Sequence, residues 1–137
     1  MDRASPARRL LVVDDEAGFR EFVQDAASDL GFEVRSASNG GSARDVYAAF
    51  QPEIVLLDIV MPEVDGIEFM RWLAQQRSAA RVILVTGYNP HDGESATRLA
   101  GALGLPDITF LAKPVRLNTL VEALNKPGPS GGAETSP

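Results

Sequence analysis

The chain has 137 residues, close to the size of one typical domain, and its 45% hydrophobic and 23% charged residues suit a soluble globular protein. It contains no cysteine, which excludes disulfides, thiolate metal sites and cysteine nucleophiles. The net charge of −6 argues against direct binding to nucleic acid or to an anionic membrane, and no stretch approaches the roughly 20 apolar residues of a membrane span. We therefore expect a single-domain cytoplasmic protein.

Strand and helix patterns alternate along the chain. In chain order, the sequence predicts a strand over 10–13, a helix over 16–30, a strand over 32–35, a helix over 42–50, a strand over 54–57, a helix over 65–76, a strand over 82–85, a helix over 95–103, a strand over 108–111 and a helix over 117–124. Four of the strands lack polar alternation, as in strands buried on both faces, whereas 32–35 alternates like an edge strand. This order predicts an α/β fold with a parallel sheet covered by helices on both faces.

Two side chains of the helix over 65–76 lie off its apolar stripe, Phe69 and Trp72. A marginal core position is the favoured interpretation for both, over a partner-binding patch. At the two ends of the chain, residues 1–7 are expected to form a flexible arm, and residues 127–137, rich in Pro, Gly and Ser, a disordered tail or linker. The predicted domain therefore spans residues 8–126.

Polar functional groups follow four of the five predicted strands. In an open α/β sheet these carboxyl ends meet at one edge, where ligands bind. Carboxylates gathered there would repel one another unless a divalent cation neutralised them, and a ligand set of oxygens alone favours Mg²⁺. The groups are Asp14 and Asp15 after the first strand, Asp58 after the third, Thr86 after the fourth and Lys113 after the fifth.

A lysine and a threonine beside a bound cation supply what a transferred phosphoryl group needs. The ammonium of Lys113 offsets negative charge on one phosphoryl oxygen, and the hydroxyl of Thr86 donates a hydrogen bond to another. Asp58, on the central apolar run, is the natural nucleophile, since a carboxylate can form an aspartyl phosphate. The sequence therefore predicts a phosphoryl-transfer site made by Asp58, Thr86 and Lys113.

Four motifs stand in order along the chain: Leu-Val-Val-Asp-Asp-Glu at 11–16, Leu-Leu-Asp-Ile-Val-Met-Pro-Glu-Val-Asp-Gly at 56–66, Thr-Gly at 86–87 and Lys-Pro at 113–114. Together they resemble the response-regulator receiver domains of two-component signalling, of the chemotaxis-regulator type. The resemblance implies a flavodoxin-like (βα)5 three-layer sandwich with five parallel strands in the order 2-1-3-4-5. It also implies a signalling switch rather than an enzyme, which takes its phosphoryl group from a sensor histidine kinase or a histidine phosphotransfer protein.

The resemblance implies a role for each matched residue. Asp58 would be the phosphoacceptor, and Mg²⁺ would be held by Asp15 and Asp58 directly, by Asp14 through water and by the main-chain carbonyl of Val60. Thr86 would turn toward the phosphoryl group, and Lys113 would be the cation that binds it. Phe110 would be the aromatic switch that moves inward when Thr86 shifts, and Pro114 would follow a cis peptide bond. An output protein or domain is implied without being identified, and a phosphorylation-dependent dimer is left open.

Two positions depart from a water-activating pattern. Val60 lies two residues beyond Asp58, and Tyr88 two beyond Thr86. In this family those side chains border the phosphoryl group, and neither an apolar nor an aromatic residue readily positions a hydrolytic water. The sequence therefore predicts slow self-dephosphorylation. The segment between Thr86 and Lys113 is also longer than in the commonest receivers, which either changes the partner surface or has no consequence.

Three other functions compete with the switch. A phosphatase of the haloacid-dehalogenase type would need a second Asp where Val60 stands. A flavodoxin-like flavin carrier would need a phosphate loop where the acidic residues 14–16 would repel phosphate. A receiver-like module that binds partners without phosphorylation is the third alternative, and the intact set of five site residues argues against it.

Overall fold

The computed structural model describes residues 8–59, 65–76, 78–87, 98, 101–105 and 108–126. In chain order, the elements within these ranges are β1 (Arg9–Val13), α1 (Ala17–Asp29), β2 (Glu33–Ala37), α2 (Gly40–Phe50), β3 (Ile54–Asp58), α3 (Asp65–Gln75), β4 (Arg81–Thr86), β5 (Ile108–Ala112) and α5 (Leu117–Asn125). All five predicted strands are confirmed. Of the predicted helix over 95–103, residues 98 and 101–103 are described and helical; the expected arm 1–7 and tail 127–137 lie outside the described residues.

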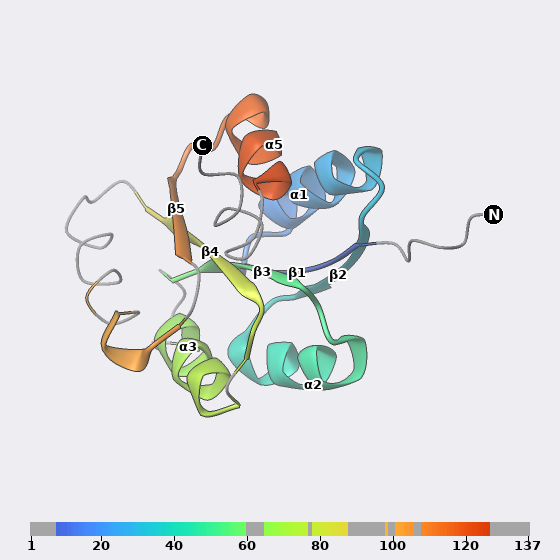
Figure 1. The fold of residues 1–137 in the computed structure, drawn as a ribbon. Coiled ribbons are helices and arrows are strands. Elements are labelled where there is room, and N and C mark those ends of the chain that lie inside the picture. The colour runs from blue at the N-terminus through green and yellow to red at the C-terminus, as the bar shows by residue number, and fades with distance from the viewer. Residues whose placement is uncertain are drawn as a thin grey trace, which may run out of the picture.

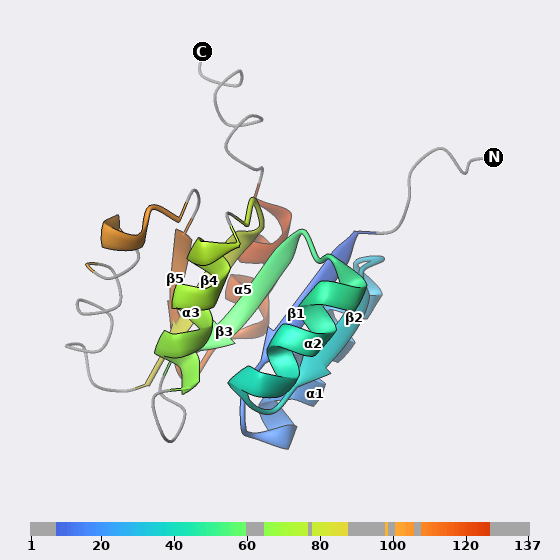
Figure 2. The same cartoon turned by 90° about the horizontal axis from the view of Figure 1, so that it is seen from below.

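The five strands form one parallel sheet in the order β2-β1-β3-β4-β5, as the flavodoxin-like prediction requires. Helices α1 and α5 cover one face of the sheet, and α2 and α3 cover the other (Figures 1 and 2). The result is a three-layer α/β sandwich. None of the helices in the described part of the chain is long and apolar enough to cross a membrane.

Alternating side chains of the central strands build two cores, one on each face of the sheet. On β1, Leu11 and Val13 pack with α2 and α3, whereas Leu10 and Val12 pack with α1 and α5. All four side chains are fully buried, which explains why this strand lacks polar alternation. The edge strand β2 is instead only partly buried along most of its length.

The aromatic residues of α3 belong to the core. Phe69 is fully buried, and its ring stacks on Trp72 with 5.8 Å between centroids. Trp72 also meets the ring of Tyr47 from α2 edge-on, with centroids 5.4 Å apart. Phe69 is therefore a fully buried core residue and Trp72 a partly buried one packed against the core, which confirms the core interpretation over a partner-binding patch.

Local signals fix the entry into β2 and the start of α2. Gly31 adopts a φ of 93° just beyond the end of α1, a left-handed conformation that glycine reaches without steric cost. The next backbone N–H, of Phe32, donates to the carbonyl of Ala27 at 3.0 Å and turns the chain toward β2. After β2, the side chain of Asn39 accepts a hydrogen bond from the backbone N–H of Ser42 at 2.8 Å and caps α2.

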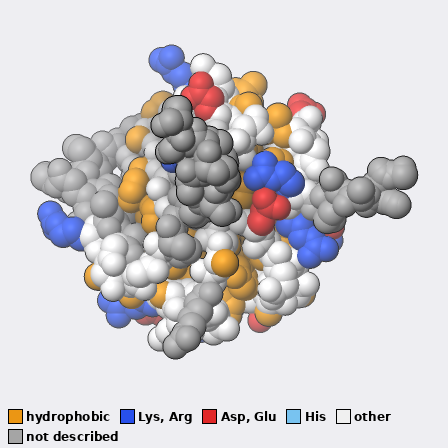
Figure 3. Space-filling view, viewed as in Figure 1, with side chains coloured by type: hydrophobic (Ala, Val, Ile, Leu, Met, Phe, Trp, Pro, Cys, Tyr) orange, Lys and Arg blue, Asp and Glu red, His pale blue; other side chains and the backbone are white. Residues whose placement is uncertain are grey.

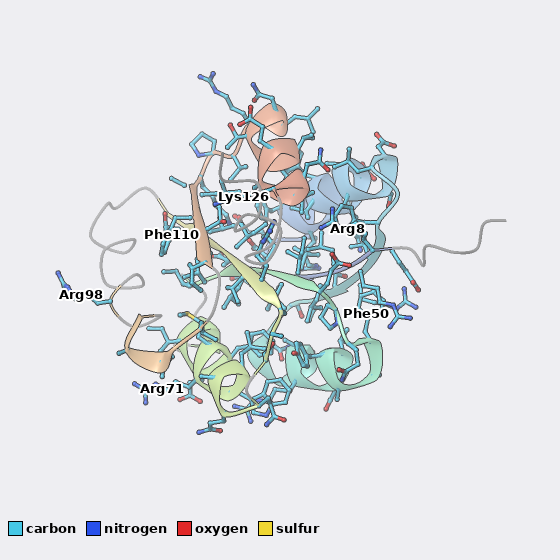
Figure 4. All side chains as sticks on the ribbon, viewed as in Figure 1. Arg8, Phe50, Arg71, Arg98, Phe110 and Lys126 are labelled. Atoms are coloured by element: carbon cyan, nitrogen blue, oxygen red, sulfur yellow. The ribbon has the colours of Figure 1, made fainter. Side chains whose placement is uncertain are left out.

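Arginines hold the amino-terminal edge of the sheet together. Arg8 forms an ion pair with Glu53 at 2.9 Å, and Arg9 donates to the carbonyl of Phe50 at the end of α2 at 2.7 Å. The buried Arg81 donates to the carbonyl of Lys126, just past α5. Figure 4 labels Arg8, Phe50 and Lys126, and Figure 3 shows acidic and basic side chains lying next to one another in the same view. These contacts tie helix ends to the edge opposite the predicted site.

At the carboxyl edge, backbone hydrogen bonds extend the ladder beyond the strands. The N–H of Asp14 donates to the carbonyl of Ala37 at 3.1 Å, and that of Lys113 donates to the carbonyl of Thr86 at 2.9 Å. The peptide bond between Lys113 and Pro114 is cis, as the resemblance implied. The backbone of the predicted site residues therefore belongs to the sheet framework.

At Gly66, α3 packs closely against the backbone at the end of β3. A Cβ atom at this position would lie 2.8 Å from Ile59 Cα and 2.9 Å from the carbonyl oxygen of Asp58, both backbone atoms. We expect Gly66→Ala to destabilise the protein by about 1–3 kcal/mol, since the clash is with main chain. Urea unfolding measures the change.

The matched control for this prediction is Gly18→Ala in α1. A Cβ atom at Gly18 would meet nothing within 4 Å. The substitution should leave stability unchanged or raise it by up to ~1 kcal/mol through helix propensity. Equal stability of the two variants would contradict the packing interpretation of Gly66.

Candidate functional site

The carboxyl edge of the sheet brings the predicted acidic residues together. Asp14 and Asp15 follow β1, and Asp58 is the last residue of β3. A carboxylate oxygen from each lies within 4.8 Å of the other two. Asp14 and Asp58 are buried and Asp15 is exposed, so the cluster opens to solvent on the side of Asp15. The predicted cluster of three carboxylates is present.

Lys113 reaches into this cluster from the end of β5. Its Nζ lies 3.3 Å from Asp58 Oδ2, 3.1 Å from Asp14 Oδ2 and 2.7 Å from Glu16 Oε1. The ammonium also lies 4.7 Å from the ring centroid of Phe19 in α1, in a cation–π contact. One cation thus offsets part of the repulsion among carboxylates that come from two strand ends and the start of a helix.

The environment of Lys113 keeps it charged. Its side chain is 15% exposed, and this partial burial lowers the pKa. The contacts with Glu16, Asp58 and Asp14 together outweigh burial and raise the pKa of Lys113 above that of a free lysine. The ammonium is therefore available as a fixed positive charge beside Asp58.

Asp14 is held by hydrogen bonds through both its main chain and its side chain. Its carbonyl accepts a hydrogen bond from Arg20 Nη1 at 2.7 Å, and its Oδ1 accepts one from the backbone N–H of Glu16 at 2.8 Å. Burial raises the pKa of Asp14 from its usual 3.8 to about 6, and the charge of Asp58 adds to the rise, whereas the Glu16 N–H and Lys113 lower it. Its Oδ2 is buried and makes no hydrogen bond, although Lys113 Nζ lies 3.1 Å away.

A hard divalent cation fits this donor set. The cluster offers only oxygen ligands, and one of them, Asp14 Oδ2, is a buried carboxylate oxygen that lacks a hydrogen bond. The nearby Lys113 ammonium offsets only part of the cost of burying this oxygen, because it is shared with Asp58 and Glu16. The side chains of Asp14, Asp15 and Asp58 are therefore suited to hold Mg²⁺. The fourth predicted ligand, the carbonyl of Val60, lies outside the described residues.

The two predicted switch residues come from neighbouring strands. Thr86 ends β4, is buried, and donates from Oγ1 to the carbonyl of Leu111 at a long 3.5 Å. Phe110 on β5 pairs in register with Leu84, two residues before Thr86, and its side chain is 39% exposed. Figure 4 labels Phe110 on β5. The inward movement of Phe110 stays a prediction.

Sequence reasoning missed how Glu16 and Phe19 contact Lys113. Glu16 follows the acidic pair directly, but nothing in the sequence shows that its carboxylate faces β5 rather than the N–H groups of α1. Phe19 belongs to an apolar helical stripe, which predicts core packing and gives no sign of an ammonium over its ring. Both contacts depend on how α1 sits beside the end of β5.

The buried state of Asp14 gives a testable pH dependence. The folded protein binds the Asp14 proton more tightly than the unfolded chain does, so this group destabilises the fold as pH rises from about 4 to about 6. In metal-free buffer we expect Asp14→Asn to be more stable than the wild type by about 1–3 kcal/mol at pH 7. The difference should shrink toward pH 4, as measured by urea unfolding.

Asp15→Asn, which removes the same charge from the exposed neighbour, is the control. A stability difference for Asp14→Asn that is the same at both pH values, or equally large for Asp15→Asn, would show that burial of Asp14 is not its cause.

Comparison with known proteins places this fold and site in one family. The family model for the response regulator receiver domain matches residues 10–125. The chain is 35% identical over 121 residues to the chemotaxis protein CheY of Bacillus subtilis, covering 88% of this chain and 97% of that protein. It is 40% identical over 112 residues to the regulatory protein AtoC of Escherichia coli, covering 82% of this chain and 23% of AtoC.

Solved structures agree on the fold. The CheY-like receiver domain protein from Methanospirillum hungatei superposes with a TM-score of 0.77 at 24% identity, covering 88% of this chain and 93% of that one. The architecture, the carboxylate cluster at the strand ends and the family match over residues 10–125 lead to the same conclusion. This chain belongs to the family of response regulator receiver domains of two-component systems.

Proposed function

We propose that this chain is a phosphorylation-dependent signalling switch in which Asp58 accepts the phosphoryl group. The observation that carries the proposal is the contact between Lys113 Nζ and Asp58 Oδ2 at 3.3 Å, inside the three-carboxylate cluster. It places a fixed cation beside the carboxylate that would attack phosphorus. Family membership favours this function over the phosphatase and flavin-carrier alternatives.

The chain's own residues would act mainly by placing a nucleophile, a positive charge and a hydrogen-bond donor around the transferred phosphoryl group. An Asp58 carboxylate oxygen forms the new bond to phosphorus, while the bond from phosphorus to the donor's leaving atom breaks and its electron pair leaves with the donor. During this exchange Lys113 would neutralise charge on a phosphoryl oxygen, and the Thr86 hydroxyl would donate a hydrogen bond to another. Mg²⁺, held by Asp14, Asp15 and Asp58 and by the Val60 carbonyl, would neutralise further negative charge on the group.

The switch itself would use the strand ends on either side of the site. Phosphorylation adds roughly two negative charges at Asp58. Thr86 and Lys113 would engage them, and Phe110 on β5 would follow Thr86. The covalent group can bias the two arrangements only through contacts that differ between them, and these side chains would provide such contacts.

The proposed partners follow from the same chemistry. A sensor histidine kinase or a histidine phosphotransfer protein would supply the phosphoryl group in the cytoplasm. An output protein or domain would bind the altered face; in the regulatory protein AtoC the matching part is 23% of a longer chain. A phosphorylation-independent interaction module is the second candidate, favoured only by the part of Phe110 left open to partners, 39% of its surface.

Intact mass after incubation with Mg²⁺ and a small-molecule phosphodonor tests the proposal. We expect the wild type to gain one phosphoryl group and Asp58→Asn to gain none, because the amide removes the attacking carboxylate. EDTA should suppress the gain in the wild type. A gain in both proteins would move the acceptor away from Asp58, and a gain in neither would favour the phosphorylation-independent module.

A second test concerns the lifetime of the phosphoryl group. Val60 and Tyr88 lie outside the described residues, so this prediction rests on the sequence. Polar replacements that orient water, Val60→Asn and Tyr88→Glu, should shorten the lifetime of the phosphorylated protein, followed by loss of the added mass after donor removal. The control is the conservative replacement Val60→Ile, which should leave the lifetime near that of the wild type. A lifetime that lengthens in Val60→Asn or Tyr88→Glu would contradict the prediction.

A further inference from the structure

We propose that Glu16 is a positioning residue that binds the Lys113 ammonium and thereby affects two steps, binding of the divalent cation and phosphorylation. Its carboxylate strengthens binding of the divalent cation, and it delays delivery of Lys113 to the phosphoryl group. The inference rests on the proposed function, because it concerns the same site. Glu16 Oε1 is the acidic oxygen closest to Lys113 Nζ, at 2.7 Å. Asp14 Oδ2 lies 3.1 Å and Asp58 Oδ2 3.3 Å from the same nitrogen.

Glu16 lies at the start of α1, at the position from which a side chain can cap the helix by accepting a hydrogen bond from its first N–H groups. It is the N-cap residue of α1, yet its side chain makes no capping hydrogen bond. The carboxylate reaches instead to Lys113 at the end of β5, 97 residues further along the chain. The orientation therefore serves a contact between strand ends rather than the local helix.

The backbone of Glu16 is held by its neighbours. Its N–H donates to Asp14 Oδ1 at 2.8 Å, and its carbonyl accepts from the N–H of Arg20 at 3.1 Å. The side chain of Glu16 is 65% exposed, whereas that of Lys113 is 15% exposed. An anchored main chain and an open side chain let the Glu16 carboxylate capture the ammonium or release it to solvent without repacking the core.

The metal and the ammonium would draw on the same two carboxylates. Asp14 and Asp58, which the cation needs, are also the other two acidic partners of Lys113. Glu16 gives the ammonium a third carboxylate, outside the cluster of three, to which it can stay bound when a cation takes the first two. It also adds a negative charge near the site. Both effects favour the divalent cation, so loss of the Glu16 charge should weaken its binding.

During phosphorylation Glu16 has the opposite effect, because it competes with the phosphoryl group for the Lys113 ammonium. While the bond from phosphorus to Asp58 forms and the donor's leaving group departs with its electron pair, Lys113 has to bind a phosphoryl oxygen to stabilise the transition state. Its hydrogen bond to Glu16 is then broken or shared. Loss of Glu16 removes this competitor, so phosphorylation at saturating Mg²⁺ should become faster. Opposite changes in metal affinity and maximal rate distinguish this role from a purely structural one.

The experiment compares the wild type, Glu16→Gln and Glu21→Gln. Glu21 lies on the same helix, is exposed, and loses the same charge when replaced. Titration calorimetry measures the Mg²⁺ dissociation constant without phosphodonor, and intact mass follows phosphorylation by acetyl phosphate at saturating Mg²⁺. For Glu16→Gln we expect a dissociation constant about two- to tenfold higher and a phosphorylation rate about two- to tenfold higher. Glu21→Gln should match the wild type in both.

Each other outcome overturns the inference. A dissociation constant equal to that of the wild type, the same change in Glu21→Gln, or a slower phosphorylation rate in Glu16→Gln would show that Glu16 does not hold the ammonium in this way. Failure of the proposed function has a different signature, because the wild type itself would then gain no mass. A wild type that is phosphorylated beside an unaltered Glu16→Gln rejects the role of Glu16 alone.

Discussion

The ion pairs of Lys113 are the interaction on which the site depends. Asp14 and Asp58 are buried at neighbouring strand ends, where two carboxylates without a cation would repel each other and lose their hydration. Lys113 is itself mostly buried, and its charge is retained because the acids around it outweigh the effect of burial on its pKa. The end of β5 is thereby fastened to the ends of β1 and β3.

The sheet fixes the positions of these charged side chains relative to one another. Backbone bonds from Asp14 to Ala37 and from Lys113 to Thr86 continue the parallel ladders into the loops, so the site residues share the rigidity of the strands. Gly66 lets α3 approach the backbone at the end of β3, where any side chain would meet main-chain atoms. The geometry around Asp58 is therefore fixed by backbone packing as much as by charge.

Burial at this edge leaves the site short of positive charge. The carboxylate cluster holds three acids, Glu16 adds a fourth, and Lys113 is the lysine that contacts them among the described residues. Burial, with a smaller contribution from the charge of Asp58, raises the pKa of Asp14, and its Oδ2 makes no hydrogen bond although the shared ammonium of Lys113 lies 3.1 Å away. A divalent cation adds positive charge to the site, and a phosphoryl group adds negative charge. Glu16, which binds the Lys113 ammonium, can therefore influence both metal binding and phosphorylation.

The sequence by itself determined the elements and the order of the motifs, because both depend on local properties. Apolar runs predicted the buried strands, and the polar residues after the strands indicated the edge where a site forms. The family resemblance then supplied the strand order, which the structure confirms. Only the tertiary structure decided that Phe69 is fully buried, that Asp14 lacks a hydrogen bond at Oδ2, and that Glu16 rather than Asp58 is nearest to Lys113. These features join residues far apart in the chain, and their distances depend on how helices pack against strand ends, which periodicity along the sequence does not encode.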